Sequence, residues 1–288
     1  ILVDYEITYV LDGGTNAENN PASYTVENAV TLEDPVRAGY RFAGWYTAAD
    51  DTGSRVMEIS AGSTGARTLY AQWTAVEQIY EIHHMIEKLD GSGYEEAEVT
   101  EAAAPTGTTV TIGKGQSKAY DGFTFNESRM EDSTGIIPGE GTLKLKLYYS
   151  RNQYDVTFVS GTKVNPETQS VPYQGKATEP EAPSREGYEF TGWYASTEAL
   201  KKWDFAENKV TEAVRLIAGW KADTYNVTLD RQGGTGGDEN VQAVYDSAMP
   251  GITIPVRAGY QFLGYYDAAE NGNQYYNADG SSASNWNK

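Results

Sequence analysis

The sequence PVRAGYRFAGWY at residues 35–46 returns as PSREGYEFTGWY at residues 183–194 and as PVRAGYQFLGYY at residues 255–266. The three copies share the pattern Pro-x-Arg-x-Gly-Tyr-x-Phe-x-Gly-(Trp/Tyr)-Tyr, so eight of twelve positions agree. Chance does not supply that agreement three times in 288 residues. Self-similarity of this kind is the signature of a repeat architecture, and we therefore interpret the chain as a repeat protein.

The first copy is expected to form a tight turn that leads into a strand. Proline fixes φ and lacks a backbone donor, and Gly39 can adopt a positive φ, as such a turn requires. The strand would begin at Tyr40, with Phe42 and Gly44 on the same face and Trp45 on the other, because side chains alternate along a strand. The aromatic residues thus change face at the glycine, which predicts a bend or β-bulge there.

Trp45 and Trp193 occupy one position of the pattern, and Tyr265 takes that position in the third copy. A domain of only about seventy residues without disulfides needs large side chains to form a core. We therefore predict that Trp45 and Trp193 are core residues. The alternative is an exposed aromatic platform that binds a ligand.

The composition favours strands and turns over helices. The chain contains 22 Tyr, 6 Trp and 7 Phe, together with 30 Gly. Aromatic residues are enriched in strands, and glycine is enriched in turns. The fold class predicted from the composition is therefore mainly β.

The charge and the missing cysteines exclude several classes of function. The net charge of −19 would repel nucleic acid and anionic membrane surfaces, so neither is an expected partner. A chain without cysteine has no disulfides, thiol nucleophiles or cysteine metal sites, which suits a bacterial surface. No apolar run approaches the ~20 residues of a membrane span, so no membrane insertion is expected.

Spacing predicts four domains. Trp45 and Trp193 are 148 residues apart, but Trp193 and Tyr265 only 72, so one unit of another sequence fits between the first two copies. We place the domains at residues 1–75, 76–151, 152–221 and 222–288. The links between them comprise a few residues, too short for flexible tethers, which predicts an elongated tandem array.

Alternation of apolar residues predicts the strands. In the first domain we expect them at residues 5–11, 24–31, 40–46 and 69–73. The one expected helix is short and covers residues 197–202. In the second domain a hairpin turn at residues 89–94 joins the first two of five strands, expected at 80–87, 95–100, 108–112, 122–126 and 143–149.

The domain that contains the third copy of the pattern is expected to be incomplete. In the first two copies the closing strand starts 24 and 23 residues after the tryptophan, so the third would start near position 288 or 289. Residues 222–288 should then lack that strand, unless residues 275–277 substitute for it or a neighbouring molecule supplies one. We accordingly expect the sequence to be a fragment of a larger exported protein.

The sequence contains no recognisable catalytic or metal site. His83 and His84 are the only histidines, and neighbours on a strand point to opposite faces, which disfavours a shared metal. No serine lies in a Gly-x-Ser-x-Gly elbow. Residues 90–92 and 279–281 resemble parts of calcium loops but lack the ordered carboxylates of an EF-hand. We predict no enzyme activity, no catalytic residues and no cofactor.

Several motifs together carry a family resemblance. The Tyr-x-(Val/Ile)-Thr opening, the Gly-Gly-Thr turn, the repeated twelve-residue pattern and the Leu-Tyr-Ala-x-Trp ending resemble the Listeria-Bacteroides B-repeat of internalin-type bacterial surface proteins. Residues 80–149 are similar to the mucin-binding-protein (MucBP) repeat of Gram-positive adhesins, through Leu-Asp-Gly, Gly-Phe-Thr-Phe-Asn and Leu-Lys-Leu-Tyr-Tyr. Both families have small β-grasp-like folds, which the resemblance implies for all four domains.

The resemblance also implies a function and a location. It implies a non-enzymatic repeat region on the bacterial cell surface, outside the cell, that acts as a stalk or spacer and in adhesion to host or matrix components. A host glycoprotein or glycan would be the partner. The alternative is a glycan- or peptide-binding module that uses exposed tyrosines, for which the candidates are Tyr265, Tyr266, Tyr275 and Tyr276.

Overall fold

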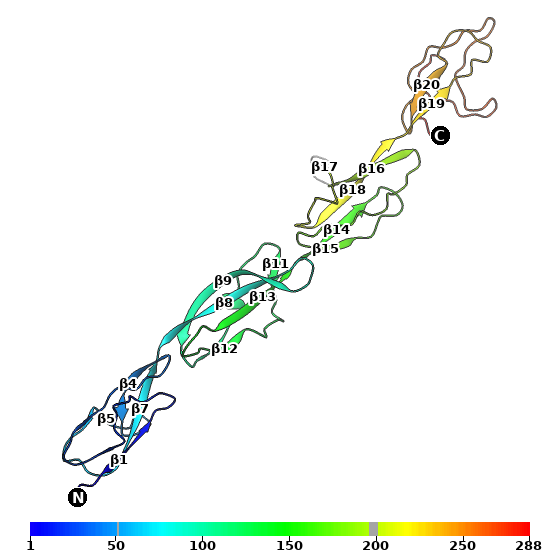
Figure 1. The fold of residues 1–288 in the computed structure, drawn as a ribbon. Coiled ribbons are helices and arrows are strands. Elements are labelled where there is room, and N and C mark those ends of the chain that lie inside the picture. Colours follow the sequence, from blue (N-terminus) through cyan, green and yellow to red (C-terminus); the bar gives the residue numbers. More distant parts are fainter. Residues whose placement is uncertain (51, 196–200) are drawn as a thin grey trace. The chain divides into compact units, whose positions relative to one another are not determined.

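The computed structural model describes residues 1–50, 52–195 and 201–288, and the chain is mainly β (Figure 1). Within these residues the strands form several small sheets, and the helical content is one 3₁₀ turn at Lys114–Gln116. The chain divides into two compact units, Ile1–Asn152 and Gln153–Lys288. Each unit contains two clusters of buried apolar residues, and each cluster lies inside one of the four ranges expected to be domains.

The first part of unit 1 contains the strands β1 (Tyr5–Val10), β2 (Ser23–Tyr24), β3 (Val30–Thr31), β4 (Tyr40–Tyr46), β5 (Arg55–Val56), β6 (Glu58–Ile59) and β7 (Arg67–Ala75). Five of them form a sheet in the order β2-β1-β7-β4-β5, and β3 pairs with β6. The central strand β7 is parallel to β1 and antiparallel to β4. β7, the closing strand of this part of the chain, is therefore paired along both of its edges.

Trp45 is the largest buried side chain of this first part. It is 2% exposed, so the prediction that it belongs to the core is confirmed. Its indole N–H donates to the carbonyl of Glu33 at 3.1 Å, and the rings of Tyr9 and Phe42 pack edge-on against it at 5.1 and 5.4 Å. Truncation of such a side chain to alanine typically costs about 3–5 kcal/mol.

Two expectations for this sheet have different outcomes. The expected bulge is confirmed: the pairing of β4 with β7 shifts between Phe42 and Gly44, and Gly44 has a φ of 140°. The prediction of a single strand at residues 24–31 is wrong, since two short strands, β2 and β3, lie there. A turn follows β2, where the carbonyl of Val26 accepts the N–H of Gly62, and it ends the extended run.

The second part of unit 1 contains the strands β8 (Glu77–Glu87), β9 (Tyr94–Pro105), β10 (Thr109–Thr111), β11 (Phe123–Phe125), β12 (Thr134–Ile136) and β13 (Lys144–Arg151). A sheet has the order β11-β13-β8-β9, and β10 pairs with β12. Each of the five strands expected here overlaps an observed one, and β12 is additional. β8 runs parallel to β13 and antiparallel to β9.

The first part of unit 2 repeats the plan of the first part of unit 1. Its strands are β14 (Gln153–Val159), β15 (Gln169–Pro172), β16 (Tyr188–Ala195), β17 (Lys201–Lys202) and β18 (Val214–Ala222). They form a sheet in the order β15-β14-β18-β16-β17, with β18 in the centre. Most of the helix expected at residues 197–202 lies outside the described residues, and its last two residues form β17.

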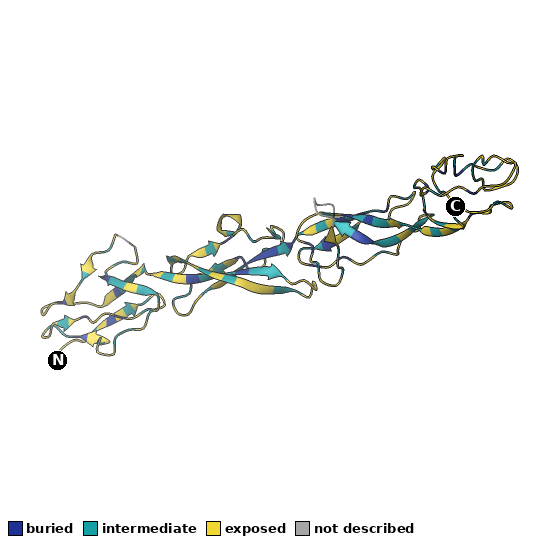
Figure 2. Ribbon diagram, turned by 90° about the horizontal axis from the view of Figure 1, so that it is seen from above, coloured by how far each residue is buried: buried dark blue, intermediate teal, exposed yellow. Residues whose placement is uncertain are grey.

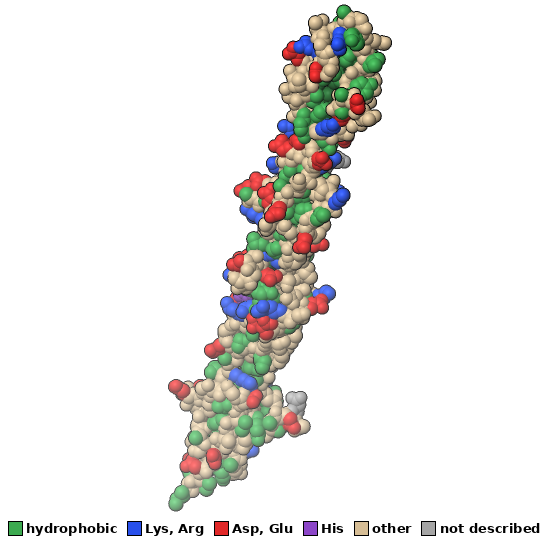
Figure 3. Space-filling view, turned by 90° about the vertical axis from the view of Figure 1, so that its right-hand side faces the viewer, with side chains coloured by type: hydrophobic (Ala, Val, Ile, Leu, Met, Phe, Trp, Pro, Cys, Tyr) green, Lys and Arg blue, Asp and Glu red, His purple; other side chains and the backbone are tan. Residues whose placement is uncertain are grey.

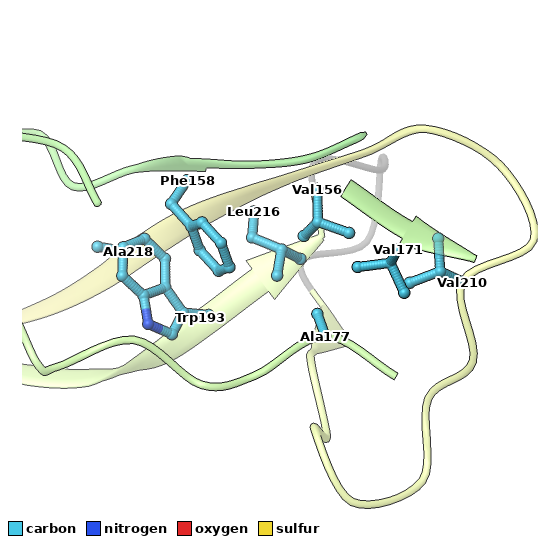
Figure 4. Packing of buried hydrophobic residues seen from close by; sticks show 8 residues of the cluster. All are labelled: Val156, Phe158, Val171, Ala177, Trp193, Val210, Leu216 and Ala218. Carbon is cyan, nitrogen blue, oxygen red and sulfur yellow. The ribbon is translucent and has the colours of Figure 1, made fainter. Parts of the chain in front are cut away.

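Trp193 anchors the core of this sheet. Figure 4 shows its indole beside Phe158 and Ala218, and the two aromatic rings meet edge-on at 5.1 Å. The side chain is 0% exposed, which confirms its predicted place in the core. As in the first sheet, the bulge is present, and the glycine, Gly192, has a φ of 130°.

The second part of unit 2 has a smaller sheet. All residues from 222 to 288 are described, and the strands among them are β19 (Thr224–Thr228) and β20 (Asn240–Val244), which pair antiparallel. The rest is turns and isolated bridges around a cluster that contains Leu229, Tyr275 and Tyr276. Figure 2 shows this part mostly as coil, coloured mainly as exposed or intermediate.

Candidate functional site

The Arg-x-Gly-Tyr segment forms the same turn in all three copies. The glycines Gly39, Gly187 and Gly259 have φ of 76°, 75° and 79°. In each copy the tyrosine N–H donates to the arginine carbonyl at 3.1 Å, and the guanidinium lies 3.9 to 4.0 Å from the centre of the tyrosine ring. The expected turn is therefore present three times, and a cation–π contact adds to each.

In unit 1 this turn contacts the next part of the chain. The carbonyl of Gly39 accepts the N–H of Val76 at 2.9 Å, and the carbonyl of Val76 accepts the N–H of Thr106 at 2.9 Å. A Cβ on Gly39 would lie 2.6 Å from both Gly139 and Thr106, so the close approach requires glycine. Val76 is the only residue between β7 and β8.

Unit 2 contains the same backbone relay. The carbonyl of Gly187 accepts the N–H of Asp223 at 2.9 Å, and the carbonyl of Asp223 accepts the N–H of Tyr245 at 2.9 Å. The rings of Tyr188 and Tyr245 meet edge-on at 5.5 Å, and a Cβ on Gly187 would lie 2.3 Å from the Tyr245 ring. Turn, linker residue and following part are thus joined in the same way in both units.

The third copy of the turn is exposed. Nothing lies within 4 Å of a Cβ built on Gly259, and Tyr260 is 68% exposed. The turn conformation is therefore intrinsic to the motif, because it forms where no following part contacts it.

A groove of about 1070 Å³ lies between β19 and the third copy of the motif. Its walls include Val227 in β19, Leu229 directly after that strand, and Phe262 and Tyr265 from the motif. Hydrophobic side chains gather on the surface of this part, which lies at the top of Figure 3. At one end Lys288 forms an ion pair with Asp267, and this contact lowers the pKa of the carboxyl group to about 2.

A family model for the Listeria-Bacteroides repeat domain matches the chain three times, at residues 5–72, 154–219 and 225–286. The chain belongs to this family. We call the matched ranges the first, second and third Listeria-Bacteroides repeats. They do not include residues 76–151, whose resemblance to the mucin-binding-protein repeat stays a prediction.

Several curated proteins are similar over large parts of the chain. A protein from Evansella cellulosilytica, named as a Gly-rich membrane protein, is 32% identical over 80% of this chain and 28% of its own length. A second membrane protein of that organism is 24% identical over 91% of this chain and 39% of its own length. Internalin H from Listeria monocytogenes is 33% identical over 53% of this chain. The chain spans less than two fifths of the length of each of these relatives.

The four candidate tyrosines all line the groove of the third Listeria-Bacteroides repeat. Tyr266 is 49% exposed, and Tyr265 is half-buried. Tyr275 and Tyr276 are 5% and 0% exposed, so the expectation of exposure is wrong for these two. Their rings fill the small core of the repeat. Ligand binding by any of the four stays a prediction.

Hydrogen bonds fix the buried hydroxyl groups. Tyr275 donates to Oδ1 of Asn287 at 2.6 Å, and Tyr276 donates to the carbonyl of Pro250 at 2.9 Å. Burial raises the pKa of Tyr276 to about 12 and also raises that of Tyr265. The Tyr265 hydroxyl has no hydrogen-bond partner among the described residues. The hydroxyls of Tyr265 and Tyr276 are therefore neutral at physiological pH.

The two histidines lie on opposite faces of β8, as expected. His83 lies between the carboxylates of Glu81 and Glu96, at 2.9 and 2.5 Å. His84 is 0% exposed and is hydrogen-bonded to the Tyr149 hydroxyl at 2.8 Å. Burial lowers the pKa of His84. The described residues contain no group of three His, Asp or Glu side chains placed to hold a metal ion.

The acidic turns that resemble calcium loops are closed by their own hydrogen bonds. Oδ1 of Asp90 accepts the N–H of Ser92 at 2.9 Å, and Oδ1 of Asp279 accepts that of Ser281 at 2.9 Å. Bonds from these serines lower the pKa of both carboxyl groups. In the described part of the chain, no helix is both long enough and apolar enough to cross a membrane.

Sequence reasoning placed junctions around both linker residues but did not predict the backbone contacts of the relay. Val76 and Asp223 share no side-chain chemistry, and their contacts use backbone atoms. One signal could have found them: each follows the closing tryptophan of its repeat, Trp73 or Trp220, by three residues.

Proposed function

We propose that the chain is a non-enzymatic repeat region of a bacterial cell-surface protein and acts as a stalk or spacer outside the cell. The observation that carries the proposal is the backbone relay, which joins a repeat to the next part of the chain in both units. The similarity to internalin H and to proteins named as membrane proteins supports a location at the surface.

A stiff spacer needs junctions that resist bending, and the relay supports such resistance. A single residue links β7 to β8, and a single residue links β18 to β19. Its N–H and C=O are both engaged by neighbouring backbone, so the linker cannot rotate about φ or ψ without losing a hydrogen bond. Each bond contributes roughly 0.5–1.5 kcal/mol.

The finer proposal is an elongated array of four small β-grasp-like domains, at residues 1–75, 76–151, 152–221 and 222–288, the second of them MucBP-like. Small-angle scattering tests the arrangement. One compact domain of this length has a radius of gyration of about 19 Å, whereas four small domains in line give roughly 30 Å or more. A value near the smaller figure would rule out the array.

The role of the junction is tested with spin labels on unit 2. The chain lacks cysteine, so Glu179→Cys and Gln242→Cys place one label in each part of the unit without competing thiols. We expect a narrow distribution of label-to-label distances. Gly187→Ala, which drives a methyl group into the Tyr245 ring, should broaden it.

Gly259→Ala is the matched control for that experiment. It imposes the same strain of alanine at positive φ, but nothing lies within 4 Å of the new Cβ. We expect it to leave the distance distribution unchanged. Equal broadening by both substitutions, or a broad distribution in the parent chain, would contradict a junction held by this contact.

Adhesion to a host glycoprotein or glycan is the other finer part of the proposal. It is supported by the resemblance of residues 80–149 to the mucin-binding-protein repeat. A screen of the whole chain against glycan and mucin arrays tests it. We expect the chain to bind one defined class of glycan on the array. If the chain binds no glycan and no mucin, the adhesion proposal is wrong and the spacer function alone remains.

A further inference from the structure

In three parts of the chain the first strand pairs directly with the last strand, and the two run parallel. β1 pairs with β7, β8 with β13, and β14 with β18. Because the strands of each pair run in the same direction, the start of the first strand and the end of the last strand lie at opposite ends of the pair. A part of the chain that is pulled at its two ends is therefore pulled at opposite ends of one strand pair.

This topology decides how a pull on the chain acts on the hydrogen bonds. The pull runs along the two strands, whereas the bonds between them run largely across, so the strands must slide past each other to separate. Sliding loads all bonds of the pair together. A hairpin that is pulled apart at its open end instead loses its residue pairs one after another. Forced unfolding is governed by the unfolding rate, and a step that breaks many bonds together is slower, so the sliding geometry withstands the larger force.

The strand pair in residues 76–151 is the longest of the three. β8 and β13 are in register over six residue pairs, from Glu81 with Lys144 to Ile86 with Tyr149. The pairs in the first and second Listeria-Bacteroides repeats comprise four residue pairs each. At the start of β13, Nζ of Lys144 also forms an ion pair with Oε2 of Glu81 at 3.2 Å. This part of the chain thus has the most bonds to break when its two terminal strands slide.

Arg151 joins the far ends of β8 and β13, where the chain leaves this sheet. Its backbone N–H donates to Oε2 of Glu87 at 2.9 Å, and its guanidinium donates to the carbonyl of Glu87 through Nε at 3.2 Å and Nη2 at 2.9 Å. Glu87 and Arg151 are the last residues of the two strands, so sliding must break these bonds. Arg151 is only 9% exposed, and bonds from a charged donor are roughly twice as strong as neutral ones.

We propose that each of these parallel pairs is a mechanical clamp, which lets its part of the chain carry tension without unfolding, and that Arg151 locks the clamp of residues 76–151. The clamp acts on any pull that enters at the start of the first strand and leaves at the end of the last one. The proposal goes beyond the spacer function, which concerns bending at the junctions. A stiff junction can join weak sheets, and a strong clamp can lie beside a flexible junction, so either proposal can fail without the other.

Pulling single molecules of the whole chain in two directions tests the clamp. The chain lacks cysteine, so two introduced thiols at exposed positions are its only attachment points for DNA handles. Ile79→Cys with Gln153→Cys pulls β8 and β13 past each other, whereas Ile79→Cys with Glu101→Cys opens the hairpin of β8 and β9 from its end. We expect the first direction to withstand at least about twice the force of the second. Equal forces, or a weaker first direction, would overturn the clamp.

Arg151→Met tests the lock in the same two directions. At a constant force that makes β8 and β13 slide, we expect the folded lifetime of residues 76–151 to fall at least about ten-fold, because the guanidinium bonds are loaded. In the direction that opens the hairpin these bonds are not loaded, and the lifetime should change less than about two-fold. Arg151→Lys, which keeps the charge and one donor group, is the milder second variant and should be intermediate. A similar fall in both directions would show a general loss of stability and overturn the lock.

Arg129→Met is the matched control for the lock. Both arginines lie over aromatic rings: Arg151 over Phe123 at 4.6 Å, and Arg129 over Tyr94 and Tyr148 at 4.7 and 4.6 Å. Tyr94 belongs to β9 and Tyr148 to β13, so these contacts of Arg129 do not join β8 to β13. We expect Arg129→Met to change the lifetime under sliding force by less than about two-fold. A fall as large as that of Arg151→Met would overturn the lock.

A third pair of handles compares clamps of different length. Asp155→Cys with Lys221→Cys, both at exposed positions, makes β14 and β18 of the second Listeria-Bacteroides repeat slide in the same way. We expect this repeat to unfold at a lower force than residues 76–151, because four residue pairs share the load there instead of six. A second repeat that withstands the larger force would show that the strand pair does not set the strength, and would overturn the proposal.

Discussion

The second and third Listeria-Bacteroides repeats share a motif but differ in how much sheet forms around it. In the second repeat β16 pairs with β18 from Tyr188 to Ala195. In the third repeat the corresponding residues 260–267 form a single isolated bridge, between Tyr266 and Gln274. Their turn, glycine φ and aromatic pair are nevertheless the same. The motif therefore encodes its own local shape, and in the second repeat the sheet forms around it through pairing with β18.

The largest expected difference between the two repeats lies in their aromatic anchors. Trp193→Ala should destabilise its repeat by about 3–5 kcal/mol, because the indole is fully buried and packs against the rings of Phe158 and Phe190. Tyr265→Ala should cost less, since its ring is only half-buried. Chemical denaturation followed by amide exchange of each repeat measures both. Equal losses would mean that the third repeat is as tightly packed as the second.

Amide hydrogen exchange in the unsubstituted chain compares β14 of the second repeat with β19 of the third. Thr157 and Thr228 occupy matching positions, and the first faces β18 while the second faces the groove. We expect the Thr228 amide to exchange at least about 100-fold faster than the Thr157 amide. This ratio corresponds to an opening free energy that is lower by ~2.7 kcal/mol at Thr228. Nuclear magnetic resonance resolves the two amides. Comparable rates in a monomer would show that the edge of β19 is protected in another way.

A pH series separates residues 76–151 from the repeats, which contain no histidine. Burial holds the pKa of His84 below its ordinary value, so between that pKa and about 6.5 the unfolded state binds more protons than the folded state. Stability must then fall as the pH falls through this window, by at most about 1.4 kcal/mol per pH unit.

The measurement is thermal unfolding between pH 7.5 and 5.5, with each part followed separately. Residues 76–151 should lose stability while the repeats change little. His84→Gln, which cannot titrate but still offers polar groups to Tyr149, should flatten the slope. An unchanged slope in that variant would show that His84 does not cause the effect.

The smallest expected effect concerns the Tyr265 hydroxyl. It is buried without a hydrogen-bond partner in the described part of the chain, so it contributes desolvation cost and no bond. Tyr265→Phe should therefore be neutral or stabilise the third repeat by up to ~1 kcal/mol. Thermal unfolding checks the sign. A clear loss would reveal a bond formed in solution by this hydroxyl, and would make the third repeat resemble the first, where Trp45 is hydrogen-bonded.

Much of the local structure could be predicted because it depends on residues close in sequence. The turn at Gly39, the bulge at Gly44 and the burial of Trp45 follow from steric rules and from the need of a small domain for core volume. The strands of residues 76–151 followed from alternation in the same way.

The remaining features depend on partners distant in sequence. The burial of Tyr275 and Tyr276 reflects the small core that closes over them in the third repeat, and alternation alone assigned no face to either. The relay through Val76 and Asp223 depends on which carbonyl of a turn faces a linker after folding. No residue type marks such a contact, since any residue except proline has both groups.

Because the bonds of the linker residue do not depend on its side chain, they bear on how such proteins gain and lose domains in evolution. Val76 and Asp223 make the same two bonds, although Val76 leads into a part of the chain with a different sheet and Asp223 leads into a further Listeria-Bacteroides repeat. A gene that duplicates, loses or imports a domain at this point needs no matched pair of new side chains to rebuild the junction. The twelve-residue motif thus forms the same backbone junction with two following parts whose sequences differ.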